Sequence, residues 1–134
     1  MTTEFFMPLK KIPTVTHQQK QVTVKNGKPI FYEPEDLKVA RAKYMAHLGQ
    51  HVPEKKYSKG PLRLIVKYCF PITNEKHYDG EFKDTKPDNG NMNKLLEDCM
   101  EDLGFYTDDC QIASLVVEKF WANMPGIYIK IEAI

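Results

Sequence analysis

Short apolar runs near the N-terminus predict the first strands of a β-sheet. Glu4–Met7 is a short, mostly apolar run that Pro8 ends, so we expect an opening strand there. Residues 21–32 alternate between apolar and polar positions around Asn26-Gly27. Because both of these residues tolerate a positive φ, the dipeptide favours a two-residue turn and predicts a β-hairpin.

The strongest strand signal lies in the middle of the chain. In residues 61–70 (PLRLIVKYCF), every second position from Leu62 to Tyr68 is apolar, and Ile65 adds bulk between them. Such alternation is typical of a strand with one face in the core. Two further strands are expected at residues 112–121 and 127–131, joined by a turn at 123–126 and paired antiparallel.

A first amphipathic helix is expected after the hairpin. Pro34-Glu35-Asp36 is a helix start, since proline fits the first turn and acidic residues favour the positive end of the helix dipole. Gly49 is expected to end this helix. Its apolar residues at helical spacing are Leu37, Ala40, Tyr44 and Leu48.

A second helix, over about residues 92–103, has a well-formed apolar stripe. Asn89 or Asn91 is expected to cap its start, and Gly104 to close its end. Its apolar positions recur at i, i+3, i+4, i+7, i+8 and i+11, which is the period of one helix face. They are Met92, Leu95, Leu96, Cys99, Met100 and Leu103.

The order of these elements indicates the fold class. Polar segments without periodicity at 9–20, 52–60 and 71–84 are predicted loops, and long loops of this kind are often functional. We therefore expect an α/β (α+β) protein in which a mixed β-sheet carries two main helices and an inserted β-hairpin. With 134 residues and no internal repeat, the chain is expected to form a single domain over residues 1–134.

Composition is typical of a globular protein without a membrane segment. Hydrophobic residues make up 42% of the chain, enough for a core, and the formal net charge is +1. Cys69, Cys99 and Cys110 lack CxxC spacing, which argues against a disulfide framework or a structural zinc site and fits a reducing compartment. The first residues lack the order of a signal peptide, and no apolar run approaches the ~20 residues that span a bilayer. We expect a soluble, cytoplasmic protein.

The charges are unevenly distributed along the chain. Residues 1–33 carry five lysines against two acids, and residues 34–83 carry ten basic residues against six acids. Residues 86–109 are the reverse, with two lysines against seven acids. A basic body with one acidic focus suits a polyanion-binding surface that holds a cation site, while a random charge mosaic explains the same counts.

The acids around the second helix have two interpretations. Asp88 stands before this helix, and Asp108 and Asp109 stand after it. Mg2+ is held by oxygen ligands, commonly one or two carboxylates with water and substrate phosphate. The helix between these acids is about 18 Å long at ~1.5 Å per residue, so they meet in one chain only if the flanking segments fold back. The residues alone leave a turn, a cap and a solvated loop as the alternative.

Residues 86–112, KPDNGNMNKLLEDCMEDLGFYTDDCQI, resemble the signature of the RusA family of Holliday junction resolvases. The shared features are a basic approach to an Asp-x-Asp-Asn motif, a helix with an early lysine, a Gly-Phe-aromatic sequence, and Asp-Asp before Gln-Ile. The strand pair VVEKFWANMPGIYIKIE continues the likeness, and the opening FFMPLKKIPTVTHQQ does so less specifically. Residues 35–60 carry nothing diagnostic.

The resemblance implies a nuclease with a defined substrate and cofactor. Members of this family are homodimeric endonucleases that depend on Mg2+, for which Mn2+ is a substitute. They bind four-way junction DNA and nick two strands of like polarity symmetrically, in DNA recombination and repair. The resemblance implies neither a nucleotide cofactor nor a membrane.

The resemblance also assigns roles to individual residues. Asp88 matches the first acid of the motif, Asn91 its asparagine, Lys94 the helix lysine, and Asp109 the late carboxylate with Asp108 beside it. It thus implies that Asp88, Lys94 and Asp109 are catalytic and that Asp88, Asp108 and Asp109 hold the metal ion and position the attacking water. Lys94 is expected to steer the scissile phosphate as a compact point charge.

The chain departs from the family motif at Gly90. The second acid of Asp-x-Asp-Asn falls on this residue, which has no side-chain ligand atom. Losing one carboxylate is expected to weaken cation binding by roughly one to a few orders of magnitude. The alternative function is therefore a catalytically weak or silent homologue that still binds junction DNA.

Several residues are expected to contact DNA, each with a simpler alternative. The residues assigned to DNA binding are Lys86, Asn91, Lys94, Lys10, Lys11 and Lys20. The early lysines, with Lys25 and Lys28, suit phosphate contacts, while lysines also protect a sheet edge from aggregation. From the residues alone, Lys94 is better explained by an i,i+4 surface pair with Asp98.

Two other groups of residues have structural explanations. His47 and His51 have i,i+4 spacing but straddle Gly49, where the helix is expected to end, which argues against a zinc pair. Phe120 and Trp121 fit either the core or a dimer face, and the core is the favoured interpretation.

Overall fold

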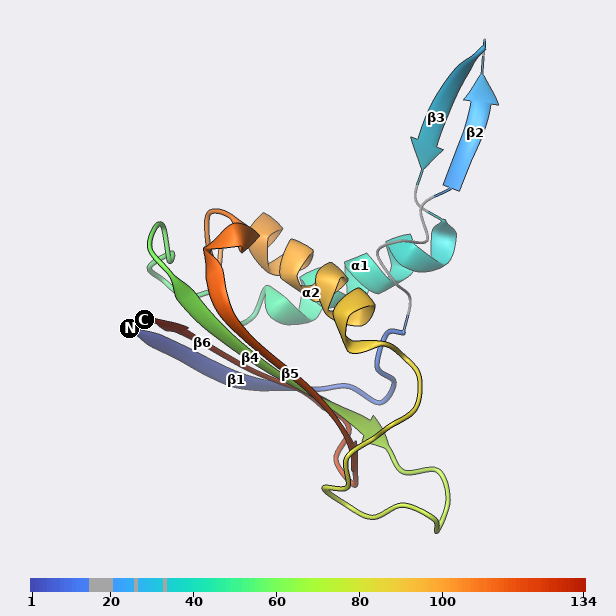
Figure 1. Cartoon of the computed structure of the whole chain (residues 1–134), viewed down its shortest axis with the longest axis vertical. Coiled ribbons are helices and arrows are strands. Elements are labelled where there is room, and N and C mark those ends of the chain that lie inside the picture. The colour runs from blue at the N-terminus through green and yellow to red at the C-terminus, as the bar shows by residue number, and fades with distance from the viewer. Residues whose placement is uncertain (15–20, 26, 33) are drawn as a thin grey trace.

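The structure, a computed structural model, describes residues 1–14, 21–25, 27–32 and 34–134. It confirms the expected element order and the α+β class, a mixed sheet with two helices (Figure 1). The strands are β1 (Thr2–Pro8), β2 (Gln21–Lys25), β3 (Lys28–Tyr32), β4 (Leu62–Pro71), β5 (Ile112–Ala122) and β6 (Gly126–Ala133). The helices are α1 (Glu35–Leu48), α2 (Asn89–Leu103) and the short 3-10 helix η1 (Asp109–Gln111).

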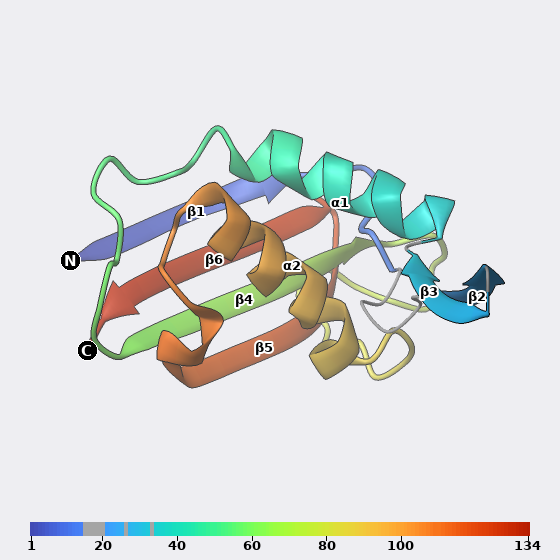
Figure 2. The same cartoon turned by 90° about the horizontal axis from the view of Figure 1, so that it is seen from above.

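The main sheet has four strands in the order β1-β6-β4-β5 (Figure 2). β6 runs antiparallel to both β1 and β4, whereas β5 runs parallel to β4. The expected pairing of the last two strands with each other is therefore wrong. β4 lies between them, so its backbone is hydrogen-bonded on both sides, and every second residue of β4 is buried.

One glycine is required where the chain enters β6. Gly126 pairs with Pro8 at the end of β1, and a Cβ at this position would lie 2.3 Å from the carbonyl oxygen of Met7. No side chain fits at that distance. Because Gly126 has none, β6 can approach β1 this closely at the start of the strand.

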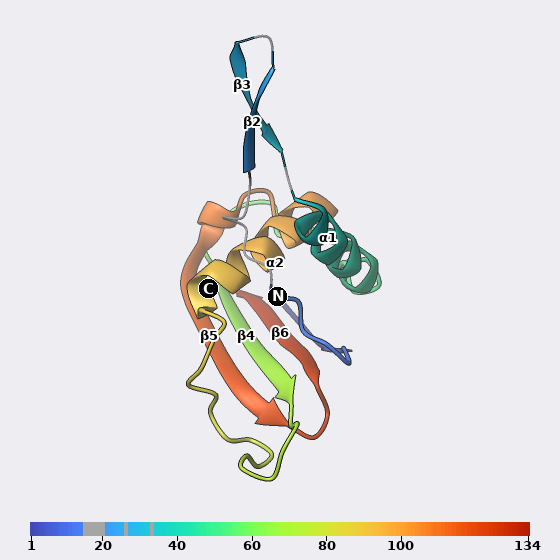
Figure 3. The same cartoon turned by 90° about the vertical axis from the view of Figure 1, so that its right-hand side faces the viewer.

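Both helices lie on the same face of the sheet and form the second layer (Figures 1 and 3). The four apolar residues predicted for α1 are all buried. On α2, Leu103 is partly exposed and the other five predicted stripe residues are buried: Met92, Leu95, Leu96, Cys99 and Met100. These two stripes belong to one buried core that also contains apolar residues of β1, β4 and β6.

The start of α2 differs from the expectation. The helix begins at Asn89, and its cap is Asp88 rather than Asn89 or Asn91. A carboxylate of Asp88 accepts the backbone N–H of Asn91 at 3.1 Å, which is the usual bond from an N-cap side chain to the third helical residue. Gly104 ends the helix with φ of +88°, as predicted.

The loop between β4 and α2 runs beside the outer edge of β5. Lys83 donates its backbone N–H to the carbonyl of Lys119, and Trp121 donates to the carbonyl of Glu81. Trp121 also packs against the core, as expected, with His77 stacked on its indole ring at 4.1 Å. The loop thus shields the C-terminal half of an otherwise open sheet edge.

The hairpin and the cysteines agree with the sequence. β2 and β3 pair antiparallel around Gly27, whose φ is +73°, and project from the helical side of the molecule (Figure 1). The three cysteines are free thiols. In the described parts of the chain, neither helix has the length and apolar character needed to cross a bilayer.

Candidate functional site

Asp88 is held at the start of α2 by bonds from the edge strand. Lys119 of β5 donates its ammonium hydrogens to the carbonyls of Thr85 at 2.5 Å and Pro87 at 2.7 Å. The side-chain amide of Asn89 donates to the carbonyl of Val117 at 3.1 Å. These bonds fix the turn before the helix, so Asp88 has a defined place above the sheet.

A pocket of about 540 Å3 opens beside Asp88. Its lining includes three of the predicted site residues, and the full set is Thr14, Lys86, Pro87, Asp88 and Asn91. A second pocket of about 200 Å3 shares Thr14 with the first, and its lining includes Lys11 and Lys43. Lysines around the positive end of a helix make this a favourable place for an anionic ligand.

The remaining predicted DNA contacts are spread more widely. Lys10 is exposed next to Lys11, whose carbonyl accepts a hydrogen bond from Lys43 at 2.7 Å. Lys25 and Lys28 lie at the tip of the hairpin, in β2 and β3. Lys20 lies outside the described residues.

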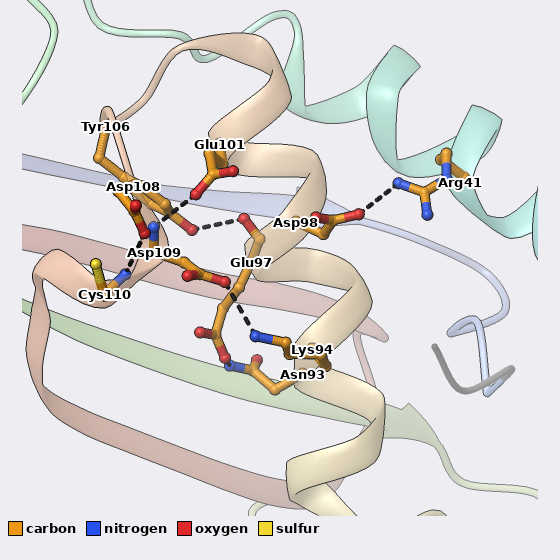
Figure 4. Close-up of polar contacts among 10 residues, drawn as sticks. All are labelled: Arg41, Asn93, Lys94, Glu97, Asp98, Glu101, Tyr106, Asp108, Asp109 and Cys110. Atoms are coloured by element: carbon orange, nitrogen blue, oxygen red, sulfur yellow. Dashed lines mark hydrogen bonds and ion pairs between the residues drawn. The ribbon is translucent and has the colours of Figure 1, made fainter. Parts of the chain in front are cut away.

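The chain reverses direction after α2 and brings the later acids beside the middle of the helix. Tyr106 donates its hydroxyl hydrogen to the carbonyl of Glu97 at 2.6 Å, and its backbone pairs with that of Tyr57. These contacts hold the returning segment against α2 (Figure 4). The segment after α2 therefore folds back along the helix, as the acids would need in order to approach one another. This holds for Asp108 and Asp109, which follow the helix.

Lys94 and Asp109 form an ion pair across this reversal. Their Nζ and Oδ2 atoms lie 3.0 Å apart, and the Asp109 hydrogen bond raises the pKa of Lys94. Asp98, the neighbour suggested by i,i+4 spacing, is instead bonded by Arg41 of α1 at 2.8 Å. The ion-pair partner of Lys94 is thus a distant residue of the chain, which helical spacing does not show.

Three carboxylates gather at this end of the site. Glu101, Asp108 and Asp109 each offer an oxygen atom within 4.8 Å of the others. Glu101 accepts the backbone N–H of Asp109 at 2.6 Å, and Asp108 accepts that of Cys110 at 2.9 Å. Hydrogen bonds from the thiol and the backbone amide of Cys110 lower the pKa of Asp108, so this carboxylate is charged at neutral pH.

Glu101 is the residue that the sequence interpretation missed. In an amphipathic helix an acid opposite the apolar stripe is normally solvated, so nothing in its type singles it out. Its spacing carries a signal, because Glu101 is seven residues after Lys94 and the two lie on one face of α2. The position of Asp109 along that face appears only in the folded chain.

Asp88 does not join this carboxylate group within one chain. Among residues 1–14, 21–25, 27–32 and 34–134, the groups of three or more acids within 4.8 Å include Asp109 and Asp108 but not Asp88. The structure therefore brings together Lys94, Asp108 and Asp109 of the predicted set. It leaves Asp88 with Lys86 and Asn91 at the pocket near the start of α2.

The donor set of the carboxylate group fits a hard divalent cation. Three carboxylates close together supply only oxygen ligands, which Mg2+ and Mn2+ prefer over the nitrogen and sulfur donors of zinc sites. Lys94 beside them offers a positive charge that a phosphate oxygen would also attract. The arrangement thus has the parts needed to hold a cation and a phosphodiester side by side.

Gly90 lies one helical turn before Lys94, at the position where the motif has its second acid. A Cβ built there would lie 3.4 Å from Oδ1 of Asp88 and meet nothing closer. A side chain at this position would therefore fit, and it would sit next to the Asp88 carboxylate.

Comparisons with known proteins point to one family. The family model for endodeoxyribonuclease RusA matches residues 11–132. The chain is 35% identical, over the whole length of both proteins, to a crossover junction endodeoxyribonuclease rusA from Lactococcus phage r1t. It is also 29% identical to the uncharacterized protein YqaN of Bacillus subtilis (strain 168), over 84% of each chain.

Proposed function

The chain belongs to the endodeoxyribonuclease RusA family, and from this premise we propose that it resolves Holliday junctions by paired, symmetric nicks. Its substrate is four-way junction DNA, and its cofactor is Mg2+, for which Mn2+ substitutes. The process it serves is DNA recombination and repair. The reaction is the hydrolysis of one phosphodiester bond in each of two strands.

The contact between Lys94 and Asp109 carries this proposal. A lysine and an aspartate 3.0 Å apart, with Asp108 and Glu101 beside them, join a phosphate-binding charge to a cation-binding group. Neither residue packs the core, since both side chains are partly exposed to solvent. A purely structural role would not require three acids to stand together, because their mutual repulsion opposes folding.

The carboxylates of Asp109, Asp108 and Glu101 would hold the metal ion. When bound, such an ion activates water and offsets the charge that develops on the phosphate. Lys94 then neutralises an oxygen of the scissile phosphate, and the amide of Asn91 and the ammonium of Lys86 orient the DNA strand. Lys10, Lys11 and Lys20 extend the basic surface for neighbouring phosphates.

We assign Asp88 to the site through a second copy of the chain. A homodimer matches the two-fold symmetry of a junction, because two identical sites then reach two symmetry-related strands. Since Asp88 stands apart from Asp109 within one chain, the dimer would supply the Asp88 of one copy to the carboxylate group of the other.

The decisive experiment is a cleavage assay on a synthetic four-way junction with a Mg2+ titration. We expect paired nicks with the wild-type chain, and we expect Asp109→Asn to lower the cleavage rate by at least about 100-fold while junction binding is kept. Glu75→Gln is the control. It removes one exposed carboxylate from the loop between β4 and α2, outside the carboxylate groups that could hold a cation.

A second function has one observation in its favour. Gly90 supplies no carboxylate where the motif has one, so the chain could act as a junction-binding protein with weak or no cleavage. A wild-type protein that binds junctions but does not cleave them at any metal concentration would favour this second function. Equal affinity for linear duplex and junction DNA would contradict both.

A further inference from the structure

A chain of hydrogen bonds runs from the sheet to the edge of the site. Tyr68 of β4 donates its hydroxyl hydrogen to Oδ1 of Asn93 at 2.7 Å, and the amide of Asn93 donates to Oε2 of Glu97 at 2.8 Å. Tyr68 and Asn93 are both 0% exposed. Among the described residues, Asn93 is the one polar side chain other than tyrosine in the buried class.

The burial of Asn93 calls for an explanation. It lies on the core side of α2 next to Met92, where an apolar side chain would fill the space without the cost of desolvating an amide. Its two hydrogen bonds offset that cost but leave little net gain over an apolar residue. What the amide provides instead is a fixed position for the Glu97 carboxylate, one helical turn away.

Glu97 is held so that its carboxylate faces the ion pair. Lys94 and Glu97 have i,i+3 spacing on α2, and Figure 4 shows Lys94 reaching toward Asp109 above and the Glu97 carboxylate below. The Glu97 charge adds to that of Asp109 in raising the pKa of Lys94. Within the described residues, Oε1 of Glu97 takes no hydrogen bond from any other group, so one oxygen is available to the lysine.

The ion pair and a bound cation compete for the same carboxylate. Lys94 occupies Oδ2 of Asp109 at 3.0 Å, and Asp109 is also the member of the carboxylate group nearest to Lys94. A divalent cation bound to this carboxylate repels the lysine ammonium and weakens the ion pair. Lys94 then keeps a favourable electrostatic interaction near the site only if another anionic group lies within reach of its ammonium.

We propose that Glu97 is a positioning residue that receives the Lys94 ammonium when a cation occupies Asp109. The buried Tyr68–Asn93 pair keeps the Glu97 carboxylate in place for this exchange. The inference rests on the proposed function for the presence of a cation, and it adds a residue that the family resemblance does not assign. Lys94 then stays beside the cation, where it can meet a phosphate, instead of moving into solvent.

The exchange is tested with Mn2+ alone, without DNA. Isothermal titration calorimetry gives the Mn2+ affinity of four proteins: wild type, Glu97→Gln, Lys94→Met and the double variant. Glutamine keeps an oxygen that accepts the Asn93 amide hydrogen, so the hydrogen-bond chain and the fold are retained, and thermal melting checks this. Glu75→Gln, on the exposed loop between β4 and α2, serves as the control for the loss of one negative charge.

We expect Glu97→Gln to weaken Mn2+ binding by about three- to fivefold, as for the loss of one partly exposed ion pair. Lys94→Met should strengthen binding, because it removes the competitor for Asp109. In the Lys94→Met background, Glu97→Gln should change the affinity by less than about twofold, since the lysine it serves is gone.

Three results would overturn the inference. An equal loss in both backgrounds would make Glu97 a direct ligand or a general source of negative potential, and no loss in either would leave it a structural residue. Absence of Mn2+ binding by the wild-type chain would also remove its basis. The Mn2+ titration does not depend on cleavage. If the titration shows the expected coupling but the separate assay shows no junction cleavage, the proposed function is contradicted and this inference stands.

Discussion

At the scale of single residues, Gly90 decides how the site compares with its family motif. Its place on α2 has room for a side chain, and a Cβ there would contact the Asp88 carboxylate at 3.4 Å. An aspartate would therefore add a second carboxylate beside the first, as the motif has it. The missing carboxylate thus concerns position 90 alone.

We expect Gly90→Asp to raise the cleavage rate or lower the Mg2+ concentration required, because it restores a hard oxygen ligand. The measurement is the initial rate of junction cleavage over a Mg2+ titration. Gly90→Ala is the control. It stabilises α2 by about 0.5–1 kcal/mol without adding a charge, and it should leave the Mg2+ requirement unchanged. Identical kinetics for Gly90→Asp and wild type would show that this position does not face the cation.

At the scale of an element, the start of α2 combines a structural and a proposed catalytic role in Asp88. Its carboxylate caps the helix through the N–H of Asn91, and it also lines the larger pocket. Sequence spacing suggested an asparagine cap, because Asn89 and Asn91 are equally good capping types. In the folded chain Asp88 is the cap, and the side-chain amide of Asn89 donates instead to the carbonyl of Val117 in β5, a tertiary contact that spacing does not show.

Two substitutions of Asp88 separate these roles. Asparagine caps helices as well as aspartate does, so Asp88→Asn should leave the free energy of unfolding within about 0.5 kcal/mol, whereas Asp88→Ala should lower it by about 0.5–2 kcal/mol. Both variants lose the carboxylate, and both should lose junction cleavage. Urea unfolding and the cleavage assay measure the two effects. Full cleavage by Asp88→Asn would mean that Asp88 only caps the helix.

At the scale of the whole molecule, the two halves of the proposed site are separate within one chain. The helices cover one face of the sheet, while the residues of β4 that point to the other face are partly exposed. Val116 on the neighbouring β5 is 39% exposed as well. Asp88 and Asp109 both lie on the helical side, at α2, so a two-fold pair that joins them across copies must use the helical layer rather than this open face.

Mixing two inactive variants tests this arrangement. Asp88→Asn and Asp109→Asn homodimers should each fail to cut, but a heterodimer of the two contains one site in which both residues are intact. We expect co-expressed chains to make single nicks in the junction, seen on a denaturing gel. Sedimentation velocity should give twice the mass of one chain. A monomer, or no nicking by the heterodimer, would show that the two acids do not act across copies.

The sequence alone determined the local features of this protein. Alternation along β4, the stripe on α2 and the Asn26-Gly27 turn predict their elements because each depends on neighbours within a few residues. The motif around Asp88 to Asp109 likewise identified the family, because it is contiguous in the chain.

The tertiary structure decided every relation between distant segments. It placed β4 between β5 and β6, paired Lys94 with Asp109 instead of Asp98, and added Glu101 to the carboxylate group. These contacts follow from how the helices pack on the sheet and from the reversal after Gly104. Periodicity shows which side of a helix or strand faces the core, but not which other element packs against it. The site depends on contacts between distant elements, so only the tertiary structure reveals it.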